Sequence, residues 1–370
     1  MEDIQEMLLR CQKDAVPCVI ATIIEVEGSA YRREGTRCLF MPDGQVIGIV
    51  SGGCIEEDLR MHADEVLKSG EPRRVRYDFR TGEDEEWGTG VGCNGAIALW
   101  LELFDPVGKP EEAEWIAGDM RNRLKATAPY EAATVIATSD AARMPPGTRW
   151  VRKAGAYDGR LGTDRKAGIV PDTIGDIQVE LLVERISPRP ELIIVGVGED
   201  ARLLCRLARM LQWRVTILYH KTEKASPERF PEADEIRLIP RLAFEQADVA
   251  GKYAVIMTHQ LELDREAVRK MLSDEIAYLG LVGSRSRLER ILQDLTAAQG
   301  PLEPHLLEKL YSPVGLDIGA ETPQEIALSI MAEMTAHRRG RSGAPLRNRK
   351  GIPSASGFAR ASALKEESHV

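Results

Sequence analysis

Residues 280–287 combine side chains and a backbone pattern that would suit an anion. They read Gly-Leu-Val-Gly-Ser-Arg-Ser-Arg, which is typical of a strand that ends directly before a helix. Gly283, Ser284, Arg285 and Arg287 would set backbone N–H groups, a hydroxyl and two guanidiniums around one point. The segment predicts a cradle for a phosphate or a similar anion. A helix cap with surface ion pairs is the alternative interpretation.

Two cysteines lie in glycine-rich loops and are candidates for sulfur or metal chemistry. Cys54 follows Gly52 and Gly53, where a ligand can approach the backbone closely, and Cys93 lies in a second such loop. Soft thiolates suit a metal–sulfur centre, and a loop position leaves a thiolate accessible. A single ligand with a phosphate and a metal–sulfur centre would account for these loops and for the anion cradle.

The cysteine spacing limits the metal chemistry of the chain itself. The six cysteines stand at positions 11, 18, 38, 54, 93 and 205. No two of them have C-x-x-C spacing, so we predict neither a zinc ribbon nor an iron–sulfur cluster, and no metal site of the chain's own. Cys18 and Cys205 lie in apolar runs and are expected to pack in the core as free thiols.

Residues 193–201 have the G-x-G-x-x-A pattern of a dinucleotide-binding fold. They read Ile-Ile-Val-Gly-Val-Gly-Glu-Asp-Ala, a buried strand followed by a turn and a helix start. Gly196 and Gly198 would permit the tight turn and the approach of a pyrophosphate to the helix N-terminus. The pattern predicts a Rossmann-type domain. His259 follows a central strand at its carboxyl end, where such sheets bind ligands, and is a further candidate site residue.

The ligand of this turn stays open in the sequence. The second strand ends at Tyr219, where an Asp or Glu would hold the ribose of NAD, and Glu199 and Asp200 place negative charge at the turn. The two favoured interpretations are a Rossmann fold with an altered or unused cofactor site and a phosphate ligand other than NAD. Ordinary NAD binding ranks below both.

The whole chain predicts an α/β protein. Residues 1–186 predict an N-terminal mixed α/β domain, in which residues 111–184 show a helix, a few strands and a long Gly/Asp-rich connection. Residues 187–340 alternate short apolar strands with helices, as in a Rossmann-like domain with a parallel sheet. Residues 341–370 lose all periodicity and predict a disordered basic tail. The expected strands of the second domain are 192–195, 215–219, 236–239, 254–257 and 277–282.

Composition excludes several classes of protein. The chain is 43% hydrophobic and 29% charged, which fits a soluble protein, and its net charge of −9 argues against a nucleic-acid binder. The N-terminus is acidic, unlike a signal peptide, and no apolar run approaches the roughly 18 residues of a membrane span. We therefore expect a cytoplasmic protein that binds neither nucleic acid nor membrane.

Four segments, in this order, resemble the XdhC/CoxI family of accessory proteins. Residues 27–35 are similar to its Gly-Ser-x-Pro-Arg-x-x-Gly loop, residues 50–56 to its Gly-Gly-x-x-Glu element, and residues 93–95 to its second Cys-Gly loop. Residues 315–333, with Gly-Leu-Asp-Ile-Gly-Ala-Glu-Thr-Pro at their start, are the most specific match. The resemblance covers about residues 15–340 and therefore both expected domains.

The resemblance implies a role in the maturation of molybdenum hydroxylases such as xanthine dehydrogenase. Family members bind the molybdenum cofactor (molybdopterin), protect it during sulfuration and hand it to the apo-dehydrogenase. This chain would then hold the cofactor as a transient ligand in purine catabolism. Its partners would be a xanthine dehydrogenase-type molybdoenzyme and a cysteine desulfurase, and a homodimer would help to close a shallow cleft.

The resemblance also implies site residues in both domains. The terminal phosphate of the cofactor, or its nucleotide, would lie on the Rossmann turn and the anion cradle, and Cys54, then Cys93, would approach the molybdenum or relay sulfur. Glu199 and Tyr219 stand where the family typically has His and Asp, which leaves nucleotide specificity open. The residues expected to close over the pterin are Gly28, Ser29, Arg32, Arg33, Gly52 and Gly53.

Two enzymatic alternatives remain. An NAD(P)-dependent oxidoreductase could use the same fold, and His220 and Lys221 would then favour NADP, but no hydride-transfer or acid–base constellation is recognisable. Xanthine dehydrogenase itself needs a far longer chain and cysteines that can ligate two iron–sulfur clusters. The sequence favours a cofactor-binding maturation factor over a stand-alone enzyme and leaves catalytic activity open.

Overall fold

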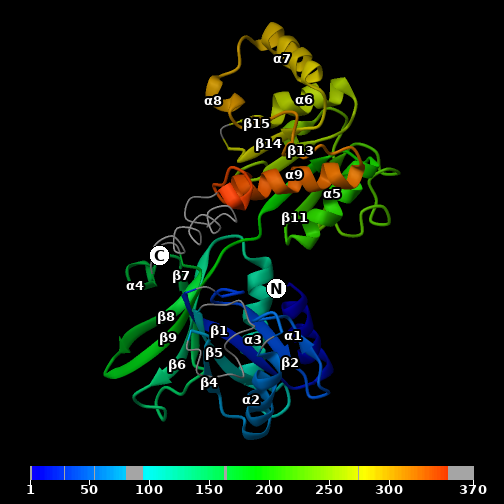
Figure 1. Ribbon diagram of the computed structural model, residues 1–370. Helices are drawn as coiled ribbons and strands as arrows, with labels where there is room; N and C mark the ends of the chain where they lie inside the picture. The colour runs from blue at the N-terminus through cyan, green and yellow to red at the C-terminus, as the bar shows by residue number, and fades with distance from the viewer. Residues whose placement is uncertain are drawn as a thin grey trace, which may run out of the picture. The chain divides into compact units, whose positions relative to one another are not determined.

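The chain forms two compact units, Met1–Arg189 and Pro190–Val370. The computed structural model (Figure 1) describes residues 2–28, 30–53, 55–80, 95–161, 165–273 and 275–348. Most of the expected basic tail lies outside the described residues, and its disorder stays a prediction. In the part of the chain that is described, no helix has both the length and the apolar character that crossing a membrane requires.

The first unit is built around a five-stranded antiparallel sheet with the order β3-β2-β1-β5-β4. Alternate residues of its central strand face opposite sides: Val19, Ala21 and Ile23 pack against α2, and Cys18 and Ile20 pack against α1 and α3. The strands are β1 (Cys18–Gly28), β2 (Arg37–Phe40), β3 (Val46–Ile47), β4 (Arg73–Asp78) and β5 (Gly95–Phe104), and the helices are α1 (Glu2–Asp14), α2 (Glu56–Ser69) and α3 (Pro110–Lys125).

A second, four-stranded antiparallel sheet with the order β7-β6-β9-β8 completes this unit. It packs on the first sheet through an apolar cluster that includes Ile24 and Trp100 on one side and Ile136 and Leu182 on the other. Its elements are β6 (Tyr130–Thr138), β7 (Arg149–Lys153), α4 (Asp158–Leu161), β8 (Ala167–Ile174) and β9 (Ile177–Ile186).

The second unit is a six-stranded parallel sheet with the order β12-β11-β10-β13-β14-β15. In chain order this is 3-2-1-4-5-6, the order of dinucleotide-binding folds. Its strands are β10 (Glu191–Val195), β11 (Arg214–Tyr219), β12 (Glu235–Leu238), β13 (Tyr253–Ile256), β14 (Tyr278–Leu281) and β15 (Leu310–Tyr311). The predicted fold class, an N-terminal mixed α/β part and a Rossmann-like parallel sheet, is confirmed.

Helices cover both faces of the parallel sheet. One face buries apolar residues of α5 (Glu199–Met210) and α9 (Pro323–Arg338), which lie side by side in Figure 1. The other face buries residues of α6 (Leu261–Met271) and α7 (Arg285–Gln299). The shorter elements of this unit are η1 (Phe244–Gln246), α8 (Pro304–Leu307) and η2 (Leu346–Asn348).

β2 and β3 form a hairpin whose second strand is very short. Only Val46 and Ile47 pair with β2. Gly48 has φ +90° and lies so close to the backbone of Arg37 that a Cβ would come within 2.9 Å of its carbonyl oxygen. The strand therefore ends at this glycine, and the chain continues into the loop before α2.

Candidate functional site

The loop between β10 and α5 forms a narrow turn with an open helix N-terminus behind it. A Cβ on Gly196 would lie 2.6 Å from the carbonyl oxygen of Met257, so the turn requires glycine for this approach to the end of β13. Gly198 is the N-cap residue of α5 and has no side chain that could cap the helix N–H groups, and a Cβ there would meet open space. The first N–H groups of α5 are thus placed to bind an anion.

The two acids at this turn both have cationic neighbours. Glu199 pairs with Arg202 at 2.6 Å, and the hydrogen bond from Arg202 lowers the pKa of Glu199. The carboxylate of Asp200 lies 3.6 Å from Nε2 of His259. The negative charge that opposes a phosphate at this helix end is therefore offset on both residues when His259 is protonated.

His259 has an unusual backbone conformation for a residue other than glycine. Its φ is +59°, and its side chain is 58% exposed at the carboxyl edge of the sheet, three residues after the end of β13. Such left-handed residues are uncommon and gather at functional sites.

The anion cradle expected after β14 is partly occupied by contacts within the protein. Arg287 donates from Nε and Nη2 to Asp264, whose side chain is completely buried. The hydroxyl of Ser284 caps α7 by accepting from the backbone N–H of Arg287 at 3.3 Å. Arg285 is exposed. A Cβ on Gly283 would lie 2.6 Å from Cδ of Arg287, so this glycine makes room for the arginine.

The candidate residues of the second unit lie along one edge. Because β10, β13 and β14 are neighbours in the parallel sheet, the segments that follow them lie side by side. These segments hold Gly196 and Gly198, then His259, then Gly283 to Arg287. At the end of β11, burial and nearby Lys221, Arg241 and Lys224 lower the pKa of His220, which marks this end of the edge as basic.

In the first unit, Glu56 organises the Gly-Gly loop before α2. Its carboxylate accepts from the backbone N–H groups of residues 50, 51, 53 and 55 at 3.0–3.3 Å and from the hydroxyl of Ser51 at 2.6 Å. Burial acts to raise the pKa of Glu56, but these hydrogen bonds outweigh it and lower the pKa. Gly52 and Gly53 are exposed and have positive φ, as this wrapped loop requires.

The loop after β1 lies next to this Gly-Gly loop. The ring of Tyr31 is 3.8 Å from where a Cβ on Gly52 would be, and Arg32 lies over the same ring at 5.1 Å. Arg32 and Arg33 are exposed. Gly28 ends β1 opposite Gly95, the first residue of β5. The structure thus brings these two predicted loops together, while Ser29, Cys54 and Cys93 lie outside the described residues.

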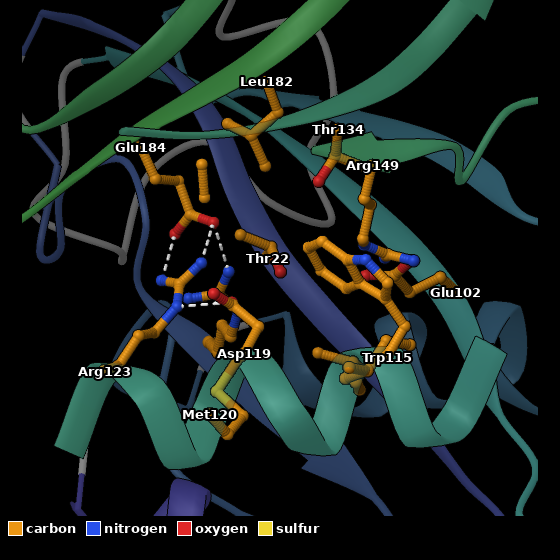
Figure 2. A pocket seen from close by; sticks show the side chains of 14 residues that line it. Thr22, Glu102, Trp115, Asp119, Met120, Arg123, Thr134, Arg149, Leu182 and Glu184 are labelled. Carbon is orange, nitrogen blue, oxygen red and sulfur yellow. Dashed lines mark hydrogen bonds and ion pairs between the residues drawn. The ribbon is translucent and has the colours of Figure 1, made fainter. Parts of the chain in front are cut away.

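Two cavities of the first unit differ greatly in size. The one in Figure 2, between α3 and the two sheets of the first unit, has a volume of about 20 Å³, room for about one water molecule. An open groove of about 720 Å³ lies along β8 and β9, and its charged groups Arg160 and Asp172 pair with each other. Within the described ranges, no cluster of three or more His, Cys, Asp or Glu could hold a metal ion.

Four cysteines, Cys11, Cys18, Cys38 and Cys205, are buried free thiols, as expected for Cys18 and Cys205. Burial raises the pKa of Cys205 to about 12, so it stays protonated. The sequence interpretation missed Asp264, which accepts hydrogen bonds from Thr258 and Arg287, and the carboxylate role of Glu56. The role of Glu56 had a signal in the sequence, because this acid follows Gly52 and Gly53 closely and can accept from the N–H groups of a loop that curls around it.

Known families and proteins match both the N-terminal and the C-terminal part of the chain. Residues 192–334 match the XdhC Rossmann domain, and residues 11–78 match the XdhC and CoxI family. The chain is 38% identical over 321 residues to the molybdenum cofactor insertion chaperone PaoD of Escherichia coli (strain K12), covering 86% of this chain and 83% of PaoD. It is 29% identical over 354 residues to a protein of Bacillus subtilis (strain 168) named as a probable xanthine dehydrogenase subunit, covering 92% and 98%.

A crystal structure from Bacillus halodurans, described as a xanthine dehydrogenase, matches with a TM-score of 0.70 and 29% identity. The match covers 96% of this chain and 99% of that one, so both units have counterparts there. With PaoD, it extends the likeness over nearly the whole length. The chain belongs to the XdhC/CoxI family.

Proposed function

We propose that this protein binds the molybdenum cofactor, supports its sulfuration and delivers it to a molybdenum hydroxylase of the xanthine dehydrogenase type. The observation that carries the proposal is the 38% identity to the insertion chaperone PaoD over 86% of this chain. The full-length likeness to a Bacillus subtilis protein named as a probable xanthine dehydrogenase subunit supports the choice of partner enzyme. A cysteine desulfurase as sulfur donor and a homodimeric state are parts of the same proposal.

The carboxyl edge of the second unit fits the phosphate end of such a ligand. The first N–H groups of α5 would donate to the phosphate, and the open space before Gly198 would admit it. His259 and Arg285, both exposed at this edge, would contribute positive charge. When bound, the cofactor itself would supply a phosphate anion and a sulfur-ligated metal.

The loops of the first unit are proposed to act on the pterin and the metal centre. Arg32 and Arg33 are exposed and carry positive charge, and Glu56 holds the exposed backbone of Gly52 and Gly53 in one conformation. We assign the sulfur relay to the thiols of Cys54 and Cys93. In the sequence, Cys54 follows Gly53, and Cys93 lies two residues before Gly95, the first residue of β5.

The test is to purify the protein anaerobically from cells that make molybdenum cofactor, oxidise the bound material and measure pterin fluorescence and molybdenum. Near-stoichiometric pterin and molybdenum are expected. Protein without pterin would refute the carrier function. In a loading assay with the apo-dehydrogenase, Cys54→Ala and Cys93→Ala should bind pterin but activate the enzyme poorly, with Cys205→Ala, in the buried core, as the control.

An NAD(P)-dependent oxidoreductase is the second candidate, because the strand order and the basic end of β11 would suit a nucleotide with a 2′-phosphate. Lys221 and Lys224 would bind that phosphate. Retention of NADPH by the purified protein, with turnover of a small carbonyl compound and no bound pterin, would favour this candidate over the carrier.

A further inference from the structure

Asp264 is a buried carboxylate whose hydrogen bonds all go to groups of this chain. Its side chain has 0% exposure. Oδ1 accepts from the backbone N–H of Thr258 at 3.2 Å and from the Thr258 hydroxyl, and Oδ2 accepts from Nε of Arg287 at 3.0 Å and from its Nη2. A buried charge is tolerated only when it is paired in this way, so Thr258, Asp264 and Arg287 form a hydrogen-bonded triad.

This triad joins three segments at the carboxyl edge of the parallel sheet. Thr258 follows β13, Asp264 lies in the first turn of α6, and Arg287 lies in the first turn of α7. Arg287 reaches the carboxylate because Gly283 has no side chain: a Cβ there would lie 2.6 Å from Cδ of the arginine. The carboxylate of Asp264 therefore connects the segment that follows β13 to the segment that follows β14.

The hydrogen bonds of this triad fix the residues on both sides of His259. The backbone N–H of Thr258 is held by Asp264, and the backbone N–H of Gln260 donates to the Thr258 hydroxyl at 3.1 Å. Between them His259 takes its left-handed φ of +59°. Residues other than glycine keep such a conformation only where their surroundings over-determine it, and these hydrogen bonds do so.

In that conformation the imidazole faces the helix end that would bind an anion. Nε2 lies 3.6 Å from Oδ2 of Asp200 in the first turn of α5, and more than half of the side chain stays exposed. When protonated, the imidazole therefore offsets the charge of Asp200 from its Nε2 side and can still donate from Nδ1 to a ligand.

We propose that Arg287, Asp264 and Thr258 are positioning residues that hold His259 over the N-terminus of α5, where His259 completes a site for the phosphate of a ligand. The choice of the cofactor phosphate as the natural occupant rests on the proposed function. Arg287 itself does not contact the phosphate. Its guanidinium is paired with Asp264, and the arginine that is available to the ligand is Arg285.

The sign of one substitution separates positioning from direct contact. If Arg287 bound phosphate directly, Asp264→Asn would remove a competing negative charge and free the guanidinium, so affinity for inorganic pyrophosphate would rise. With positioning, Asp264→Asn should weaken pyrophosphate binding to the full chain by about tenfold, the scale typical of lost supporting contacts. Calorimetric titration at constant ionic strength measures this, and a tighter complex overturns the proposal.

Two further variants guard against misfolding as the cause. Thr258→Val keeps the shape and the charge and removes only the hydroxyl, so it should weaken pyrophosphate binding in a protein that stays folded, with a melting temperature lowered by the lost hydrogen bonds. His259→Gly relieves the left-handed backbone and should keep or raise the melting temperature, yet lose affinity. Arg290→Ala, which removes an exposed charge from the same helix as Arg287, is the matched control and should bind pyrophosphate like the wild type.

The reactivity of the imidazole gives a readout that a purely structural role would not change. Carbethoxylation of His259 by diethyl pyrocarbonate, followed by peptide mass spectrometry, should be slowed by pyrophosphate in the wild type. Its rate should change in Thr258→Val while the rate at His220 stays constant. A wild type that does not bind pyrophosphate, or an unchanged His259 rate in Thr258→Val, overturns the proposal.

These measurements need no molybdenum. If the purified protein lacks pterin but these results hold, the proposed function fails and the positioning role stands. If pterin is present and Asp264→Asn binds pyrophosphate more tightly, only the positioning role fails.

Discussion

Glu184 anchors a buried ion cluster in the first unit, and its substitution tests how that unit is held together. Its carboxylate accepts from Nη2 of Arg37 at 2.6 Å and from Nη1 and Nη2 of Arg123 at 3.0 and 2.7 Å, as Figure 2 shows for Arg123 rising from α3. The three side chains are 7%, 12% and 11% exposed. Glu184 thus ties β9 of the second sheet to β2 and α3.

Glu184→Gln keeps the shape of the side chain and removes its charge. Asp119, 2.6 Å from Nε of Arg123, is then the one carboxylate left in this cluster for two guanidiniums. Leaving a buried charge unpaired costs roughly 3–5 kcal/mol. At about 2–4 °C per kcal/mol for a unit of this size, the melting temperature of the first unit should fall by roughly 6–20 °C.

The pH dependence has a definite sign. Burial alone would raise the pKa of Glu184, but the charges of Arg123 and Arg37 hold it well below its ordinary value of 4.5. The unfolded chain therefore takes up this proton first, and the stability from Glu184 is present above pH 4.5 and lost as pH falls below it. The difference between wild type and Glu184→Gln should shrink over the same window.

Calorimetry of the full chain gives the transitions, and hydrogen exchange with peptide mass spectrometry assigns the shifted one to residues 2–189. Asp176→Asn is the control, because Asp176 pairs with Arg143 at a site where both side chains are more than half exposed. Such a pair is screened by water and its loss should leave the transition in place. A Glu184→Gln protein as stable as the wild type at pH 7 would refute the reasoning.

Three further predictions follow from single contacts. Glu56→Gln replaces one acceptor oxygen by an NH₂ that faces backbone donors, so amide exchange at residues 50–55 should accelerate while the circular dichroism spectrum is unchanged. Thr322→Ala removes the capping box at the start of α9 and should cost about 1 kcal/mol in urea unfolding, whereas Thr322→Ser should not. Gly196→Ala would place a Cβ 2.6 Å from the Met257 carbonyl oxygen, so pyrophosphate binding should be lost; unchanged affinity would mean that the turn can move.

The parallel sheet was largely predictable because its strands are buried on both faces. Such strands appear as short runs of Val, Ile and Leu, and the five expected strands match β10 to β14 to within one or two residues at each end. The short strand β15, with two residues, has no such run. The glycine pattern at residues 193–201 identified the first strand, but the order of the other strands in the sheet was not predicted.

The second sheet of the first unit could not be predicted in the same way. Its central pair joins β6 to β9, so that Tyr130 lies opposite Ile186 and Thr138 opposite Val179. Nothing local in the sequence sets a pairing across some fifty residues, because the register depends on which faces the finished core buries. The sequence indicated a helix, a few strands and a connection in this segment, which agrees with α3 and β6 to β9, but it did not indicate how the strands pair.

The site shows why residue types alone identify an edge of a sheet but not its contacts. The glycines, His259 and the arginines of α7 were placed on the correct edge because strand ends of a parallel sheet converge. Residue types do not indicate which anion a guanidinium binds. The guanidinium of Arg287 already binds the buried carboxylate of Asp264, which lies 23 residues earlier in the chain. Glu56 does likewise with the N–H groups of the Gly-Gly loop.

In both units, then, a carboxylate of the chain occupies donors that sequence reasoning would give to a ligand. The proposed ligand phosphate would use the donors that these acids leave available. In the second unit these are the N-terminus of α5, the imidazole of His259 and the exposed Arg285. The internal carboxylates would then fix the loops before the ligand arrives and so reduce the conformational entropy that is lost on binding.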